Sequence, residues 1–166
     1  TTEPLTPHIV NGLKKAVEAM GTEAGYAGYD DNSSGCDSIK KAIAEKLYNN
    51  IVQPDEIHVS DGSKCDIGRL QTLFGSDVSI AVQDPSYPVY VDGSVIAGAT
   101  GFFQPQKEQF DRIHYMTCKP ENNFFPDLDK APKTDLIYFC SPNNPTGAVA
   151  TKQQLKSLVD FAKKNG

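Results

Sequence analysis

The chain has 166 residues, of which 39% are hydrophobic and 22% are charged, and its formal net charge is −5. Acidic and basic residues are interspersed without a basic tract, which argues against binding to nucleic acid. No apolar run approaches the ~18 residues that a membrane-spanning helix needs, so we expect one globular domain or part of a larger one.

The first sixty residues predict two helices joined by a polar loop. Thr6 and Pro7 have the form of an N-cap and a first helical residue, and apolar residues follow at helical spacing until Gly21. A loop rich in glycine, tyrosine and aspartate comes next, and a second helix is expected from Asp37. The chain opens without methionine and closes on Gly166 at a helix end, so we expect a segment of a longer protein.

The remainder alternates predicted strands with predicted helices. Helices are expected after the polar turns at 60–64 and 84–88, and over 151–165. Alternation of this kind is typical of right-handed crossovers and of a mostly parallel sheet covered on both sides, which predicts a three-layer α/β/α fold. The expected strands are 56–59, 78–83, 100–103, 113–118 and 135–140.

The last predicted helix has a clear start and a predicted buried face. Thr151 and Gln154 have the spacing of a capping box. The residues expected to form its buried stripe are Leu155, Leu158, Val159 and Ala162.

Four cysteines are widely spaced along the chain. They form no C-x-x-C pair and no cluster with histidine, so neither a zinc site nor a disulfide framework is favoured. We expect small, buried, reduced thiols. The four are Cys36, Cys65, Cys118 and Cys140.

Three polar turns follow predicted strands, where open α/β sheets bind ligands. The first is Ser60-Asp-Gly-Ser-Lys64. Its glycine permits close approach of the backbone, its helix offers free N–H groups, and Ser63 and Lys64 add a hydroxyl and a cation, which suits a phosphate. An ordinary N-cap with a surface lysine is the alternative interpretation.

The second and third turns carry an aromatic ring and two amides. In the second turn, 84–88, two prolines flank Tyr87 and restrict the direction of its ring, which can stack on a flat ligand. In the third turn, 141–147, two prolines end the strand, so Asn143 and Asn144 can both face the crevice. The alternatives are a packing tyrosine and a turn closed by the asparagines' own hydrogen bonds.

Taken together, the three turns resemble a known family. S-D-G-S-K-C-D, Q-D-P-S-Y-P-V-Y and F-C-S-P-N-N-P-T-G, in this order and spacing, are similar to the large domain of fold-type I pyridoxal-phosphate aminotransferases. T-T-E-P-L, G-Y-A-G-Y, N-N-F-F-P-D-L and D-F-A-K-K-N-G extend the resemblance to the LL-diaminopimelate aminotransferases and over nearly the whole chain. The resemblance implies that residues 1–166 are part of the large, cofactor-binding domain.

The resemblance also implies roles for individual residues. Ser63 and Lys64 would hold the phosphate of pyridoxal 5'-phosphate, Tyr87 would stack on its pyridine ring, and Asn144 would donate to its phenolic oxygen. Substrate would bind beside Lys64, Tyr87 and Asn144. Tyr29 would reach the cofactor site of a neighbouring subunit, which implies a homodimer.

Two departures from the family pattern bear on activity. The family's Schiff-base lysine and its pyridine-binding aspartate would lie beyond Gly166, so we expect no transamination from these residues alone. The family loop G-Y-G-x-E-Q-G, whose glutamate contacts substrate, reads G-Y-D-D-N-S-S here. Asn32 takes the glutamate position, so either Asp31 supplies the acid or the substrate differs.

The resemblance implies amino transfer between LL-2,6-diaminopimelate and 2-oxoglutarate, with tetrahydrodipicolinate and glutamate as products, in lysine biosynthesis. Two alternatives stay open: a related aminotransferase acting on lysine or another amino acid, and a truncated, non-catalytic paralogue. A plant protein would work in the plastid stroma, and a bacterial one in the cytoplasm.

Overall fold

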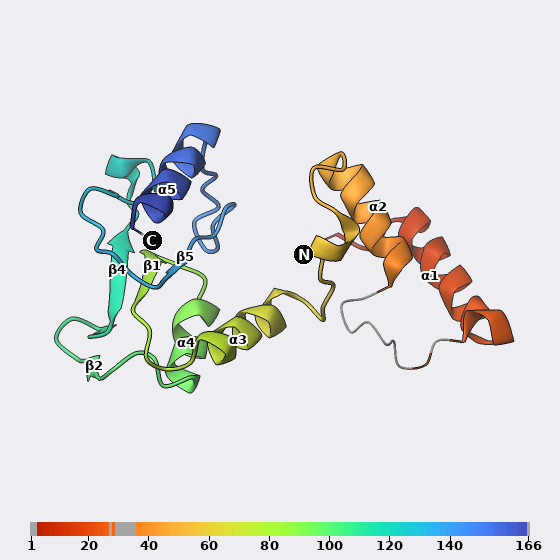
Figure 1. Ribbon diagram of the computed structural model, residues 1–166, viewed down its shortest axis with the longest axis horizontal. Coiled ribbons are helices and arrows are strands. Elements are labelled where there is room, and N and C mark those ends of the chain that lie inside the picture. Colours follow the sequence, from red (N-terminus) through yellow and green to blue (C-terminus); the bar gives the residue numbers. More distant parts are fainter. Residues whose placement is uncertain (1–2, 27, 29–35, 166) are drawn as a thin grey trace. The chain divides into compact units, whose positions relative to one another are not determined.

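The computed structural model describes residues 3–26, 28 and 36–165 (Figure 1). It divides into two compact units, Thr1–Ser60 and Asp61–Gly166. Among the described residues, no helix is both long enough and apolar enough to cross a bilayer.

The first unit contains the two predicted helices. Helix α1 spans Pro7–Met20 and α2 spans Asp37–Tyr48, with short 3-10 turns η1 at Glu23–Gly25 and η2 at Pro54–Glu56. Thr6 is the N-cap of α1, as predicted, although its side chain makes no capping hydrogen bond. The prediction of a helix from Asp37 is likewise confirmed.

The strand predicted at 56–59 is wrong. Ile57 has extended backbone angles, φ −106° and ψ 124°, but the segment pairs with no strand in the described part of the chain. A strand is defined by the hydrogen bonds of a neighbour, which a local apolar pattern cannot supply.

The second unit is built on the predicted parallel sheet. Its strands are β1 at Ile80–Asp84, β4 at Ile113–Thr117 and β5 at Leu136–Tyr138, in the spatial order β4-β1-β5 (Figure 1). Most of β1 is buried, as expected for the central strand of a covered parallel sheet. The mostly parallel α/β architecture is therefore confirmed.

β5 is shorter than the predicted strand 135–140. The backbone N–H of Cys140 donates to the side-chain Oε1 of Gln83 at 2.6 Å, instead of extending the ladder to β1. A side chain of β1, that of Gln83, thus ends the pairing between β1 and β5.

Helices and a hairpin connect the strands. Helix α3 spans Ser63–Phe74, α4 spans Val89–Ile96 and α5 spans Lys152–Asn165, which confirms the three predicted helices. A 3-10 turn, η3, covers Pro120–Asn122. The strand predicted at 100–103 is confirmed only at its end, since β2 is Phe103–Gln104, and β2 pairs antiparallel with an unpredicted strand β3, Gln109–Phe110.

A buried amide joins α3 to α4 beside the core. Gln71 Nε2 donates to the Tyr90 carbonyl at 3.3 Å and to Ser94 Oγ at 3.2 Å. The helices are so close here that a Cβ added to Gly93 would lie 2.3 Å from Gln71 Oε1. The core cluster beneath them is Ile80, Val82, Tyr90, Ala99 and Ile113.

The capping box of α5 is confirmed, but its buried stripe is wrong. Gln154 N–H donates to Thr151 Oγ1 at 3.2 Å, and Thr151 N–H donates to Gln154 Oε1 at 2.8 Å. Helical spacing identifies the apolar face of a helix but not what covers it, and within the described residues this face is only partly covered. Leu158 is half-buried, whereas Leu155, Val159 and Ala162 are exposed.

The cysteine prediction is half right. None of the four cysteines, all of which lie among the described residues, forms a disulfide, and Cys118 is buried and Cys140 half-buried. Cys36, the N-cap of α2, and Cys65, in the first turn of α3, are exposed, contrary to the expectation of buried thiols.

Candidate functional site

The sheet brings the second and third polar turns together. β1 and β5 are parallel neighbours, so the turns that follow them emerge at the same edge. A side-chain bond joins them: Asn143 Nδ2 donates to the Pro85 carbonyl at 3.1 Å. The second turn contains a cis Asp84–Pro85 bond, and the third contains cis bonds before Pro142 and Pro145.

The two asparagines of the third turn have different environments. Asn143 is 4% exposed, and its Nδ2 also donates to Thr146 Oγ1 at 2.9 Å. The prediction that Asn143 faces the crevice is therefore wrong, because its amide hydrogens are used inside the protein. Asn144 is exposed, and its side chain has no hydrogen-bond partner in the part of the chain that the structure describes. It is free to donate to a ligand.

Tyr87 lies at the end of a ladder of aromatic rings. Its ring meets Tyr90 edge-on, with the centroids 5.6 Å apart, and Tyr90 stacks on Tyr138 at 4.7 Å. Burial, and then the neighbouring Cys140 thiol, raise the pKa of Tyr90 to about 12. The ladder keeps the half-buried Tyr87 ring against the core and limits the directions that it can take.

The first turn enters α3 through a glycine in a left-handed conformation. Gly62 is the N-cap with φ +110°, an angle that side chains disfavour. Ser63 and Lys64 follow in the first turn of the helix, where N–H groups lack an intrahelical acceptor. Lys64 is exposed and forms no ion pair with a described residue. These groups have the character of an anion site.

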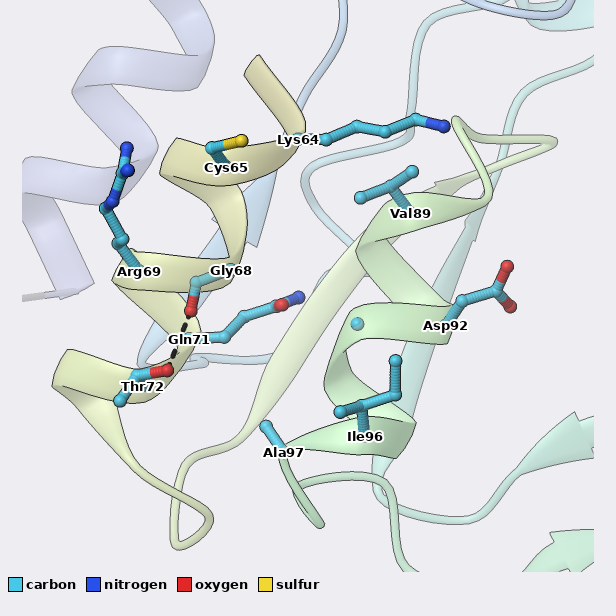
Figure 2. Close-up of a pocket in the computed structure, with 11 residues that line it drawn as sticks. Lys64, Cys65, Gly68, Arg69, Gln71, Thr72, Val89, Asp92, Ile96 and Ala97 are labelled. Carbon is cyan, nitrogen blue, oxygen red and sulfur yellow. Dashed lines mark hydrogen bonds between the residues drawn. The ribbon is translucent and has the colours of Figure 1, made fainter. Parts of the chain in front are cut away.

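Packing of α3 on α4 brings the first turn toward the second. Figure 2 shows the Lys64 side chain extending from the start of α3 past Val89, which begins α4 two residues after Tyr87. The three turns are thus connected in space. Packing of α3 on α4 connects the first turn to the second, and the Asn143 side chain connects the second to the third.

Comparison with known proteins shows the family of the chain. A family model described as "Aminotransferase class I and II" matches residues 2–166. The chain belongs to the class I and II aminotransferases.

Its relatives in that family include diaminopimelate enzymes. An LL-diaminopimelate aminotransferase of Protochlamydia amoebophila is 55% identical over 164 residues, which are 99% of this chain and 40% of that protein. A chloroplastic LL-diaminopimelate aminotransferase of Arabidopsis thaliana is 53% identical over 167 residues, covering all of this chain and 36% of that protein. The solved L,L-diaminopimelate aminotransferase of Chlamydomonas reinhardtii superposes with a TM-score of 0.91 at 53% identity, over 100% of this chain and 40% of that one. The chain thus spans about 40% of the length of these relatives.

Class I and II aminotransferases depend on pyridoxal phosphate, and the residues described here fit that group. A helix N-terminus with a serine and a lysine suits a phosphate, a fixed aromatic ring suits a pyridine, and an unpartnered amide donor suits a phenolic oxygen. Three other residues predicted from the sequence to bind cofactor or substrate lie outside the described residues: Tyr29, Asp31 and Asn32.

A hollow in the second unit does not coincide with the three turns. It has a volume of about 780 Å³ and lies between α3 and α4 (Figure 2). Only Lys64 belongs both to its lining and to the candidate site. Its wall is mainly helix surface, with Arg69 and Asp92 among the charged members, so this hollow is distinct from the candidate site at the turns.

Sequence reasoning missed the structural roles of Gln83 and Asn143. Each is a buried amide that binds the backbone of another segment. A glutamine at the end of an apolar strand was the available signal, since burying an amide is costly unless it is hydrogen-bonded.

Proposed function

We propose that this chain is the cofactor-binding segment, part of the large domain, of an LL-diaminopimelate aminotransferase. The reaction would transfer an amino group between LL-2,6-diaminopimelate and 2-oxoglutarate, giving tetrahydrodipicolinate and glutamate. The observation that carries the proposal is identity of 53–55% over essentially the whole chain with relatives named for this activity.

The turns supply the residues that would hold pyridoxal phosphate. Ser63, Lys64 and the N-terminus of α3 would bind its phosphate, and Tyr87 would lie against its ring. Asn144 would donate a hydrogen bond to the phenolic oxygen and stabilise that oxygen as an anion. When bound, the cofactor supplies an electron sink for the amino-acid substrate. Lys64 would act as a fixed positive charge beside the phosphate.

Substrate recognition would involve the loop that contains Tyr29 and Asn32. We propose a homodimer in which Tyr29 reaches the partner's cofactor and the region of Asn32 contacts the far end of the substrate. The acid at this end would come from Asp31, since the family glutamate is replaced by Asn32. A plant protein of this type would act in the plastid, as the name of the Arabidopsis relative indicates for that protein, and a bacterial one in the cytoplasm.

The test uses a full-length protein that contains these residues. LL-diaminopimelate and lysine are assayed side by side as amino donors to 2-oxoglutarate, and visible absorption reports cofactor binding. We expect a cofactor band and transfer from diaminopimelate but not from lysine. Transfer from lysine alone would refute the substrate assignment, and absence of a cofactor band would refute the site.

Two variants locate the acid that recognises substrate. If Asp31 has this role, Asp31→Asn raises the KM for diaminopimelate by about tenfold or more, as expected for one charged hydrogen bond. Asn32→Glu, which restores the family residue, is the matched control and should not weaken binding. An unchanged KM in Asp31→Asn would exclude the shifted acid.

A further inference from the structure

We propose that Asn143 is a positioning residue that sets the location of Asn144 by fastening the third turn to the second. The inference rests on the proposed cofactor site, in which Asn144 is the residue that meets the cofactor. Asn143 itself would touch neither cofactor nor substrate.

The hydrogen bonds of Asn143 are all made within the protein. Its Nδ2 donates to the Pro85 carbonyl at 3.1 Å and to Thr146 Oγ1 at 2.9 Å. The orientation of the amide is fixed, because a backbone carbonyl only accepts hydrogen bonds. With both amide hydrogens used and the side chain buried, Asn143 has no donor left for a ligand.

The oxygen of the Asn143 amide indicates that the side chain acts through its N–H donors. Asn143 Oδ1 is buried and has no hydrogen-bond partner in the described part of the chain. An apolar side chain of similar size would fill the same space without burying an unsatisfied acceptor. The amide therefore contributes through its two donors, which join the two turns.

Backbone hydrogen bonds hold the chain on both sides of Asn144. Asn143 N–H donates to the Ala148 carbonyl at 2.8 Å, and Gly147 N–H donates to the Asn143 carbonyl at 2.7 Å. These bonds close a loop from which Asn144 projects. The Gln83 side chain holds the entry to the same turn at Cys140. Movement of Asn143 would consequently carry Asn144 with it.

The experiment compares three variants of the full-length protein. Asn143→Asp keeps the shape and replaces the donor with an acceptor, and Asn144→Ala removes the proposed ligand. Asn122→Asp is the matched control, because Asn122 Nδ2 also donates to a backbone carbonyl, at 2.8 Å, that of Thr117 at the end of the neighbouring strand β4. Two quantities are measured for each: the Kd of pyridoxal phosphate, and the midpoint of the pH titration of its visible absorbance.

Loss of the bond to the phenolic oxygen disfavours the oxygen's anionic form and raises that midpoint. We expect Asn143→Asp and Asn144→Ala both to raise it and to weaken cofactor binding about tenfold, the factor for about 1.4 kcal/mol. Asn122→Asp should change neither quantity. If Asn143→Asp fails to fold, Thr146→Val removes one of its two acceptors and should shift both quantities in the same direction by less.

The outcomes separate this inference from the proposed function. A wild-type protein that binds no pyridoxal phosphate refutes both. A shift in Asn144→Ala without one in Asn143→Asp and Thr146→Val refutes only the positioning role. Equal shifts in Asn143→Asp and Asn122→Asp would show a general loss of structure and would likewise refute it.

Discussion

Gly93 lies in α4 at the point where the buried amide of Gln71 crosses from α3, which makes Gly93→Ala a sensitive test of the packing. The added Cβ would lie 2.3 Å from Gln71 Oε1, so Gln71 must move and give up its bonds to the Tyr90 carbonyl and Ser94 Oγ. Two bonds at about 0.5–1.5 kcal/mol each amount to a loss of about 1–3 kcal/mol. Alanine gains about 1 kcal/mol of helix propensity over glycine, which offsets part of the loss.

A second glycine provides the control. Gly68 lies in α3, and a Cβ added there meets nothing within 4 Å, so Gly68→Ala has the propensity gain alone. In chemical denaturation of the full-length protein, the free energy of unfolding of Gly93→Ala should fall below that of Gly68→Ala by about 1–3 kcal/mol. Equal stabilities would refute the reasoning, as would a difference that persists when Gln71 is replaced by alanine in both variants.

Three further predictions concern other parts of the second unit. Lys64→Ala should weaken pyridoxal-phosphate binding by about 10- to 150-fold in equilibrium dialysis, as expected for one charged hydrogen bond, whereas Lys107→Ala on the β2–β3 hairpin should not. In thermal unfolding, Thr151→Ala should lower the free energy of unfolding by about 1 kcal/mol through loss of the α5 cap. Thr151→Ser, which keeps the hydroxyl, should be close to wild type. Hydrogen bonds from the Ser79 hydroxyl and N–H hold the pKa of Asp135 below its ordinary value. The ionised carboxylate therefore stabilises the fold above about pH 3.9, and this contribution is lost as the pH falls through the lower pKa of the folded state. The difference in free energy of unfolding between wild type and Asp135→Asn should consequently shrink as the pH is lowered. A difference that stays constant with pH would contradict the assignment.

The sequence predicts the elements of this fold well where local signals determine them. Pro7 favours a helix start through its fixed φ, and Thr151 and Gln154 favour one through hydrogen bonds made within one turn. The structure has both starts. The apolar run at 78–83 predicts the central strand because a covered parallel strand is buried on both faces. Segment 56–59 fails because pairing depends on another part of the chain.

The candidate site shows the same division. The type and order of the three turns follow from the sequence, because proline, glycine and polar residues after apolar strands are readable locally. The different environments of Asn143 and Asn144 cannot be predicted from the sequence. The two are neighbours of identical chemistry, and an acceptor that distinguishes them, the carbonyl of Pro85, lies 58 residues earlier in the chain. Long-range acceptors of this kind leave no local periodicity.

The tyrosine ladder also makes this region observable by spectroscopy. These 166 residues contain no tryptophan, so tyrosines provide their near-ultraviolet signal. Tyr87, Tyr90 and Tyr138 are held in fixed mutual orientations, and near-ultraviolet circular dichroism is sensitive to such fixed packing. Burial raises the pKa of Tyr90 to about 12 and that of Tyr138 in the same direction, so both remain protonated at pH values where a tyrosine of ordinary pKa, about 10, ionises. Core order and the seating of the Tyr87 turn can thus be followed in the native chain without an added label.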